Sequence, residues 1–82
     1  MLKMTDYFKN KVLIKRPYLK IEWIEYVLES PVMKEIQEEE NRIRFWAYIN
    51  EIDKYIRVVT LEDGITVHNA FPDRDFTKGE LK

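Results

Sequence analysis

The chain is 82 residues long, carries a net charge of −1 and contains 45% apolar residues, one histidine and no cysteine. This length and composition predict one small folded domain and exclude a disulfide scaffold, an iron–sulfur cluster, a thiol nucleophile and a zinc site made by the protein alone. No apolar run approaches the ~18 residues of a membrane span. Residues 1–16 lack the apolar stretch of a signal peptide, and two glycines leave no phosphate-binding loop. We therefore expect a cytoplasmic protein with no metal, no cofactor and no membrane partner.

Residues 5–14 are predicted as a short helix. Thr5 is a suitable N-cap, and Phe8 and Val12 are spaced at i, i+4 on one helix face. The apolar run that begins at Val12 is equally compatible with a strand. The conformation of residues 1–15 therefore stays open.

Residues 18–29 are predicted as an amphipathic helix with a narrow polar arc. At ~100° per residue its glutamates fall on one side, and apolar residues fill the wide remainder. Pro17 suits the first turn, since its missing N–H costs nothing there. The helix should end at Ser30, because the residue before Pro31 is pushed out of the α region. The wide apolar surface indicates that other elements cover this helix on more than one side.

After the second proline, apolar and polar residues alternate, which is typical of strands. Strands are predicted at residues 42–49, 55–61 and 65–71, with a shorter first strand at 32–37. Connections of two to five residues permit only antiparallel hairpins. The sequence therefore predicts an α+β fold with two N-terminal helices packed on one face of a three- to four-stranded antiparallel meander. We expect one domain at residues 1–76 and a flexible C-terminal tail at residues 77–82.

The strand register follows from the two hairpin loops. A three-residue loop ending at Gly64, in the left-handed conformation, would pair Val59 with Val67. A preceding loop centred on Ile52 would pair Phe45 with Val59. The predicted core face holds Ile43, Phe45, Ala47, Ile49, Val59, Leu61, Ile65 and Val67. The predicted open face holds Arg44, Trp46, Tyr48, Ile56, Val58, Thr60, Thr66 and His68.

Residues suited to RNA chemistry gather on this predicted open face. Trp46 and His68 share one row, Arg44 lies in the next, and Arg74 follows the last strand. Imidazole moves protons near neutral pH, guanidinium binds phosphate, and an aromatic ring stacks on a base. These groups suit metal-free cleavage of single-stranded RNA, in which the 2′-hydroxyl attacks the adjacent phosphate. A two-residue Asp-Gly turn would instead move His68 to the core face and remove this arrangement.

A series of motifs adds a family resemblance. In order they are Arg16-Pro17, a helix to Leu28, Glu-Ser-Pro31, Arg-Ile-Arg-Phe-Trp, Tyr-Ile-Arg-Val-Val-Thr and Val-His-Asn-Ala-Phe-Pro. Over roughly residues 8–76 this order resembles a family of small domains related to the RelE, ParE and BrnT toxins. The resemblance implies a RelE-like fold, RNA cleavage by some relatives and silencing by a cognate antitoxin. By motif position it also implies Arg57, His68 and Arg74 as catalytic residues.

The alternative function is a non-catalytic module of the same fold that binds another protein. Arg44, Trp46 and Tyr48 are candidate binding residues under both hypotheses, because exposed aromatic side chains anchor protein interfaces as well as bases. The substrate, the partner and the oligomeric state are left open by the sequence.

The distribution of charge provides a way to separate the two hypotheses. Residues 1–24 carry six basic side chains and two acidic ones, whereas residues 25–41 carry one basic and six acidic. A ribonuclease should gather Arg44, Arg57 and Arg74 with this basic N-terminal part on one concave face. An interaction module should show a flat apolar patch instead.

Overall fold

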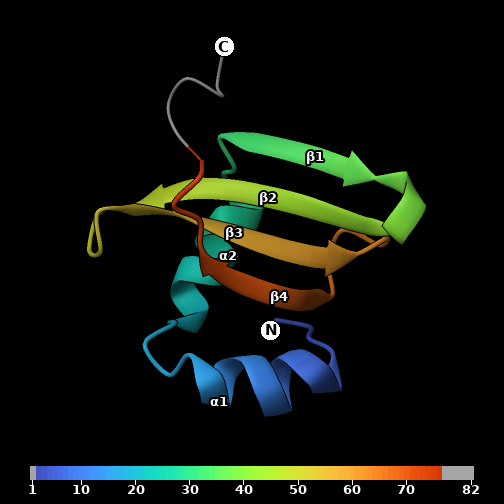
Figure 1. Cartoon of the computed structure of the whole chain (residues 1–82), viewed down its shortest axis with the longest axis horizontal. Helices are drawn as coiled ribbons and strands as arrows, with labels where there is room; N and C mark the ends of the chain where they lie inside the picture. The colour runs from blue at the N-terminus through green and yellow to red at the C-terminus, as the bar shows by residue number, and fades with distance from the viewer. Residues whose placement is uncertain (1, 77–82) are drawn as a thin grey trace.

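The computed structural model describes residues 2–76, which form two short helices and one four-stranded antiparallel sheet. The helical segments are η1 Phe8–Val12, a π-helical turn that continues into α1 Leu13–Lys15, α2 Ile21–Glu29 and the 3-10 turn η2 Glu38–Glu40. The strands are β1 Met33–Gln37, β2 Arg42–Ile49, β3 Lys54–Leu61 and β4 Val67–Pro72, which lie side by side in chain order (Figure 1). The α+β class, the first helix and the antiparallel meander are thus confirmed. The predicted tail at residues 77–82 lies outside the described residues.

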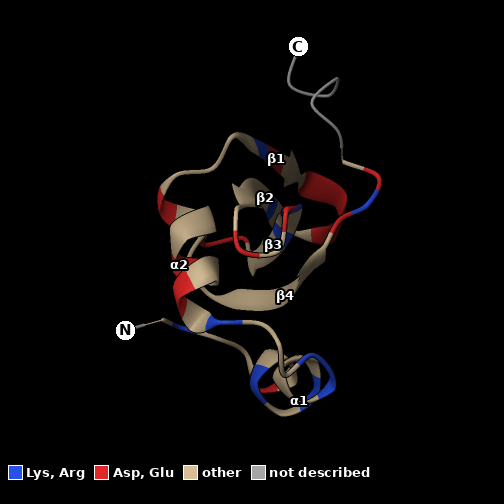
Figure 2. Ribbon diagram, turned by 90° about the vertical axis from the view of Figure 1, so that its left-hand side faces the viewer, with Lys and Arg blue, Asp and Glu red and all other residues tan. Residues whose placement is uncertain are grey.

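The two helices take different positions on the sheet. Helix α2 contacts β2 and β3, whereas η1 contacts β4. Figure 2 looks along the strands and shows α2 beside the sheet and α1 below β4. The main core consists of Phe8, Val12, Leu19, Trp23, Ile24, Val27, Ile43, Phe45, Ala47, Ile49, Ile56, Val58, Val67 and Ala70. The predicted burial of Phe45 is confirmed, and the RelE-like arrangement of the helices stays a prediction. No helix within residues 2–76 has the length and apolar character that a membrane span requires.

The residues before the first helix cover the outer edge of β4. Met4 forms a parallel bridge with Val67, and the backbone N–H of Thr5 donates to the Val67 carbonyl at 2.9 Å. The Val67 N–H donates in turn to the carbonyl of Lys3 at 2.9 Å. The Thr5 hydroxyl oxygen accepts the N–H of Phe8 at 3.1 Å, as expected for a helix cap. One edge of the sheet is therefore closed by the chain itself.

The predicted register between β2 and β3 is wrong by one residue. The loop at Asn50–Asp53 places Asp53 in the left-handed region with φ of 52°, and Phe45 faces Val58 rather than Val59. A slip of one residue exchanges the two faces of a strand. The fully buried residues of β3 are consequently Ile56, Val58 and Thr60, and its opposite face carries Arg57, Val59 and Leu61. The core positions predicted for Val59 and Leu61 are therefore wrong, as are the open-face positions predicted for the three buried residues.

The loop between β3 and β4 is longer than predicted. Gly64 has the expected positive φ of 70°. However, the Leu61 N–H donates to the Thr66 carbonyl at 2.9 Å, and Asp63 Oδ1 accepts the N–H groups of Ile65 and Thr66. The predicted core residue Ile65 is therefore in the loop and 55% exposed.

The start of β4 contains an irregularity that the sequence did not reveal. Val59 faces Asn69, but the next residue, Thr60, faces Val67. His68 is thus the extra residue of a β-bulge, which changes the direction of a side chain relative to regular alternation. The predicted pairing of Val59 with Val67 is wrong for this reason.

Candidate functional site

The face of the sheet opposite α2 is covered at Trp46. The Phe76 ring stacks on the Trp46 indole, with ring centroids 5.1 Å apart, and also contacts Tyr55 at 4.9 Å. Trp46 is only 4% exposed. The prediction that Trp46 is exposed is wrong, because the segment after β4 folds back over it.

Arg57 lies opposite Trp46 and is held by a buried carboxylate. Its Nε and one terminal nitrogen donate to Asp73 Oδ2 at 3.0 and 2.7 Å, and Trp46 Nε1 donates to the same oxygen at 2.9 Å. Burial raises the pKa of Asp73, but the hydrogen bonds from Trp46 and Arg57 and the Arg57 charge outweigh it, so the pKa lies below its ordinary value. Asp73 is therefore ionised and neutralises the guanidinium that was predicted to act on phosphate.

His68 is partly exposed at the bulge, where residues of the N-terminal segment contact it. The Tyr7 ring stacks on the imidazole at a centroid distance of 5.0 Å, and Thr5 Oγ1 lies 3.1 Å from His68 Nδ1. Because Thr5 Oγ1 accepts the Phe8 N–H, its hydrogen can be donated to Nδ1, which fits a neutral imidazole. Burial, and to a smaller extent the Arg42 charge, lowers the pKa of His68. The geometry thus favours the neutral form of this side chain.

The remaining predicted binding residues have partners of their own. Arg44 donates to Glu35 at 3.2 Å in an exposed salt bridge. The Tyr48 hydroxyl donates to Asp53, and the Tyr48 ring meets the Tyr55 ring edge-on at 5.3 Å. These contacts leave no open cluster of Arg44, Tyr48 and the buried Trp46.

The structure does not bring the three predicted catalytic residues together. Arg57 faces Phe71, which is three residues from His68 along β4, or about 10 Å in a strand. Arg74 follows β4 and lines a separate pocket. Within residues 2–76, His68 thus lies apart from Arg57 along β4, and Arg74 lines a pocket to which neither of them contributes.

Arg74 instead contributes to a pocket of about 500 Å³ that we call the basic pocket. It is lined by Arg16, Tyr18, Ile52, Lys54, Phe71, Pro72 and Arg74. The three cations come from the end of the first helix, the start of β3 and the segment after β4. No carboxylate lines the pocket, and both salt bridges found in residues 2–76 involve other side chains. Among residues 2–76, three cations thus line one pocket that has no carboxylate in its lining.

Aromatic and apolar groups form the walls of the basic pocket. Tyr18 is 50% exposed, so its ring is accessible. Two guanidinium groups lie over the Phe71 ring, that of Arg16 at 5.8 Å and that of Arg57 at 5.0 Å from its centroid. Cations beside an accessible aromatic ring suit a ligand that combines an anionic and a planar group. Sequence reasoning missed Arg16, Tyr18 and Lys54 as site residues, since no spacing rule links them.

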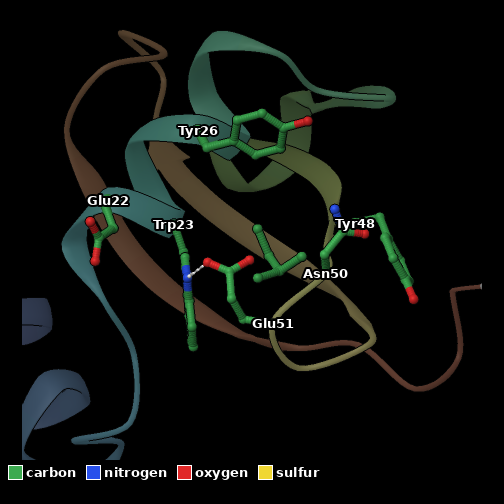
Figure 3. Close-up of a pocket in the computed structure, with 7 residues that line it drawn as sticks. Glu22, Trp23, Tyr26, Tyr48, Asn50 and Glu51 are labelled. Atoms are coloured by element: carbon green, nitrogen blue, oxygen red, sulfur yellow. Dashed lines mark hydrogen bonds between the residues drawn. The ribbon is translucent and has the colours of Figure 1, made fainter.

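A second pocket, which we call the acidic pocket, has a volume of about 310 Å³ (Figure 3). It is lined by Glu22, Trp23, Tyr26, Tyr48, Ile49, Asn50 and Glu51. Trp23 Nε1 donates to Glu51 Oε2 at 3.0 Å. The loop between β2 and β3 contributes to both pockets, Glu51 to the acidic one and Ile52 to the basic one. The two pockets therefore present opposite charges.

Within the described range, no three His, Cys, Asp or Glu side chains are grouped as a metal site.

Comparisons with protein-family models, with curated proteins and with solved structures found no match to this chain.

Proposed function

We propose that this domain binds single-stranded RNA in the basic pocket. The observation that carries the proposal is the convergence of Arg16, Lys54 and Arg74 around an accessible tyrosine ring, with no carboxylate in the lining. Cationic side chains bind phosphate oxygens, and an aromatic ring stacks on a base. Single-stranded RNA offers both groups at once, whereas the bases of a duplex are already stacked.

The proposal concerns binding, and cleavage requires a further group. A general base must lie within hydrogen-bonding reach of the proton that it removes. His68 was predicted for this role, but it lies about 10 Å along β4 from Phe71, which lines the basic pocket. Arg57 is already paired with Asp73. These contacts favour RNA binding over the toxin-type ribonuclease activity that the family resemblance implies.

The test is fluorescence anisotropy of a labelled single-stranded oligoribonucleotide at increasing salt concentration. Three phosphate contacts predict a slope of about −2 for log K against log salt concentration. The double variant Lys54→Gln/Arg74→Gln should bind more weakly, with a slope of about −0.7 from the one remaining contact. The control Lys3→Gln/Lys34→Gln removes the same charge outside the basic pocket and should retain the slope.

Three results would change this conclusion. Equal binding by the two double variants would remove the basic pocket from the function. Tighter binding of an acidic peptide than of RNA would favour the protein-binding alternative. The ribonuclease hypothesis would be restored if the wild-type domain cleaved the oligonucleotide and the His68→Ala variant did not.

A further inference from the structure

The strand register brings two cations of the basic pocket side by side. The pairing of β3 with β4 continues past the last residue of β4, because the Asp73 N–H donates to the Tyr55 carbonyl at 2.9 Å. One further step in the same register places Arg74 opposite Lys54, and both side chains line the basic pocket. Like charges that lie directly opposite each other on neighbouring strands are destabilising. An anion bound between these two side chains would offset their repulsion.

A third cation, Arg16, reaches the basic pocket from the end of the first helix. Its guanidinium lies 5.8 Å from the centroid of the Phe71 ring, which also lines the pocket. None of the three cations belongs to a salt bridge among residues 2–76. The lining does not include the acidic residues that adjoin two of these cations in the sequence, which are Asp53, Asp73 and Asp75. Three positive charges thus come together around one pocket.

The number of cations distinguishes between two kinds of phosphate. An internal phosphodiester carries one negative charge, whereas a terminal phosphate monoester carries about −1.5 to −2 at pH 7. The monoester also has three oxygen atoms that accept hydrogen bonds strongly. Hydrogen bonds between charged groups are stronger than those between neutral ones, so three cations favour the ligand with more charge and more acceptors.

The rest of the lining suits a single nucleotide. The half-exposed Tyr18 ring can stack on one base. Apolar contacts for the base and the ribose come from Ile52, Phe71 and Pro72. The volume of about 500 Å³ lies within the range of small-ligand sites, about 300–1,000 Å³. We propose that the basic pocket holds the terminal nucleotide of a single-stranded RNA by its phosphate monoester, which rests on the proposed function and names the part of the strand that is bound.

The test compares three oligoribonucleotides of one sequence by fluorescence anisotropy, each with the dye on an internal base. One has a 5′-phosphate, one has a 3′-phosphate and one has hydroxyl groups at both ends. The RNA with a phosphate at the recognised end should bind about tenfold more tightly than the hydroxyl form, which offers only diesters. The tighter of the two phosphorylated RNAs identifies that end.

The outcomes separate this proposal from the proposed function. Equal affinities of the three RNAs would overturn recognition of a terminal phosphate and leave RNA binding intact. Failure of all three RNAs to bind would overturn both.

Two variants of matched charge locate the phosphate. Lys54→Gln removes one of the two opposed cations and should lower the preference for the phosphorylated end from about tenfold to about twofold. Lys34→Gln makes the same charge change outside the basic pocket and should retain the tenfold preference. The readout is the ratio of two affinities, because a general loss of RNA binding lowers both equally. The same ratio in the two variants would overturn the assignment of the terminal phosphate to the basic pocket.

Discussion

Asp73 and Glu35 each form a salt bridge with an arginine, but they do so in different surroundings. The Glu35 side chain is 45% exposed beside Arg44, whereas that of Asp73 is 5% exposed beside Arg57. Asp73 also accepts the buried indole N–H of Trp46. Loss of the Asp73 carboxylate would leave a partly buried cation and a buried donor without an acceptor, whereas water can replace Glu35.

We therefore predict that Asp73→Ala lowers the free energy of unfolding by about 3 kcal/mol. Glu35→Ala, its matched control, should lower it by about 0–1 kcal/mol. Urea denaturation followed by circular dichroism measures both changes. A similar loss in the two variants would contradict the structural role assigned to Asp73.

At the scale of elements, the segment at residues 73–76 acts as a cover although it is neither helix nor strand. Phe76 and Asp73 close over Trp46, so the sheet is covered here as well as on the α2 face. In so small a domain, this second apolar contact adds to a limited core.

We predict that Phe76→Ala opens this cover and exposes the Trp46 indole. Quenching of tryptophan fluorescence by acrylamide should increase, because both indoles are almost fully buried in the wild type. Stability should fall by about 2–3 kcal/mol through the lost aromatic contact. Tyr18→Ala removes a half-exposed aromatic ring elsewhere and serves as the control. Unchanged quenching of Phe76→Ala would show that Phe76 does not shield Trp46.

The elements themselves could be read from the sequence, whereas their register could not. Prolines and alternating apolar residues defined α2 and β2 within a few residues. The faces of β3 depended on the length of the loop between β2 and β3. This loop, which contains the left-handed Asp53, is one residue shorter than predicted, so Ile49 pairs with Lys54 instead of Tyr55. The bulge at His68 lies where Thr5, 63 residues away in the sequence, contacts the imidazole. Such distant contacts leave no local pattern.

At the scale of the whole molecule, the net charge is only −1, although two pockets carry charges of opposite sign. Arg74 was identified as a candidate site residue from its position after the last strand, but Arg16 and Lys54 join it only because of the tertiary fold. Each carboxylate of the acidic pocket likewise occupies an ordinary surface position when viewed alone. Segment charges therefore could not predict either site.

The titrating groups also predict how the whole molecule responds to acid. The pKa values of Glu51, Asp63, His68 and Asp73 all lie below their ordinary values, that of Asp63 at about 2 because of the side-chain and backbone hydrogen bonds of Thr66. The unfolded chain then binds protons more readily than the folded one. Stability that is present above the unfolded pKa is therefore lost as the pH falls through each folded value.

We predict two stages of acid destabilisation in a melting-temperature series. The first begins as the pH falls below 6.5, the ordinary pKa of histidine, and arises from His68. The second begins near pH 4 and arises from the carboxylates. His68→Gln should remove the first stage and retain the second. A melting temperature that rises between pH 7 and 5.5 would contradict the direction of the His68 shift.

The bridge between Met4 and Val67 determines when these two segments can pair during synthesis on the ribosome. The two partners are separated by 63 residues (67 − 4). Translation at ~5–20 residues per second takes about 3–13 s to cover that interval. During that interval the segment around Met4 has no strand to pair with, because β4 has not yet been synthesised. This edge of the sheet therefore closes only after β4 has been synthesised and can pair with a segment translated seconds earlier.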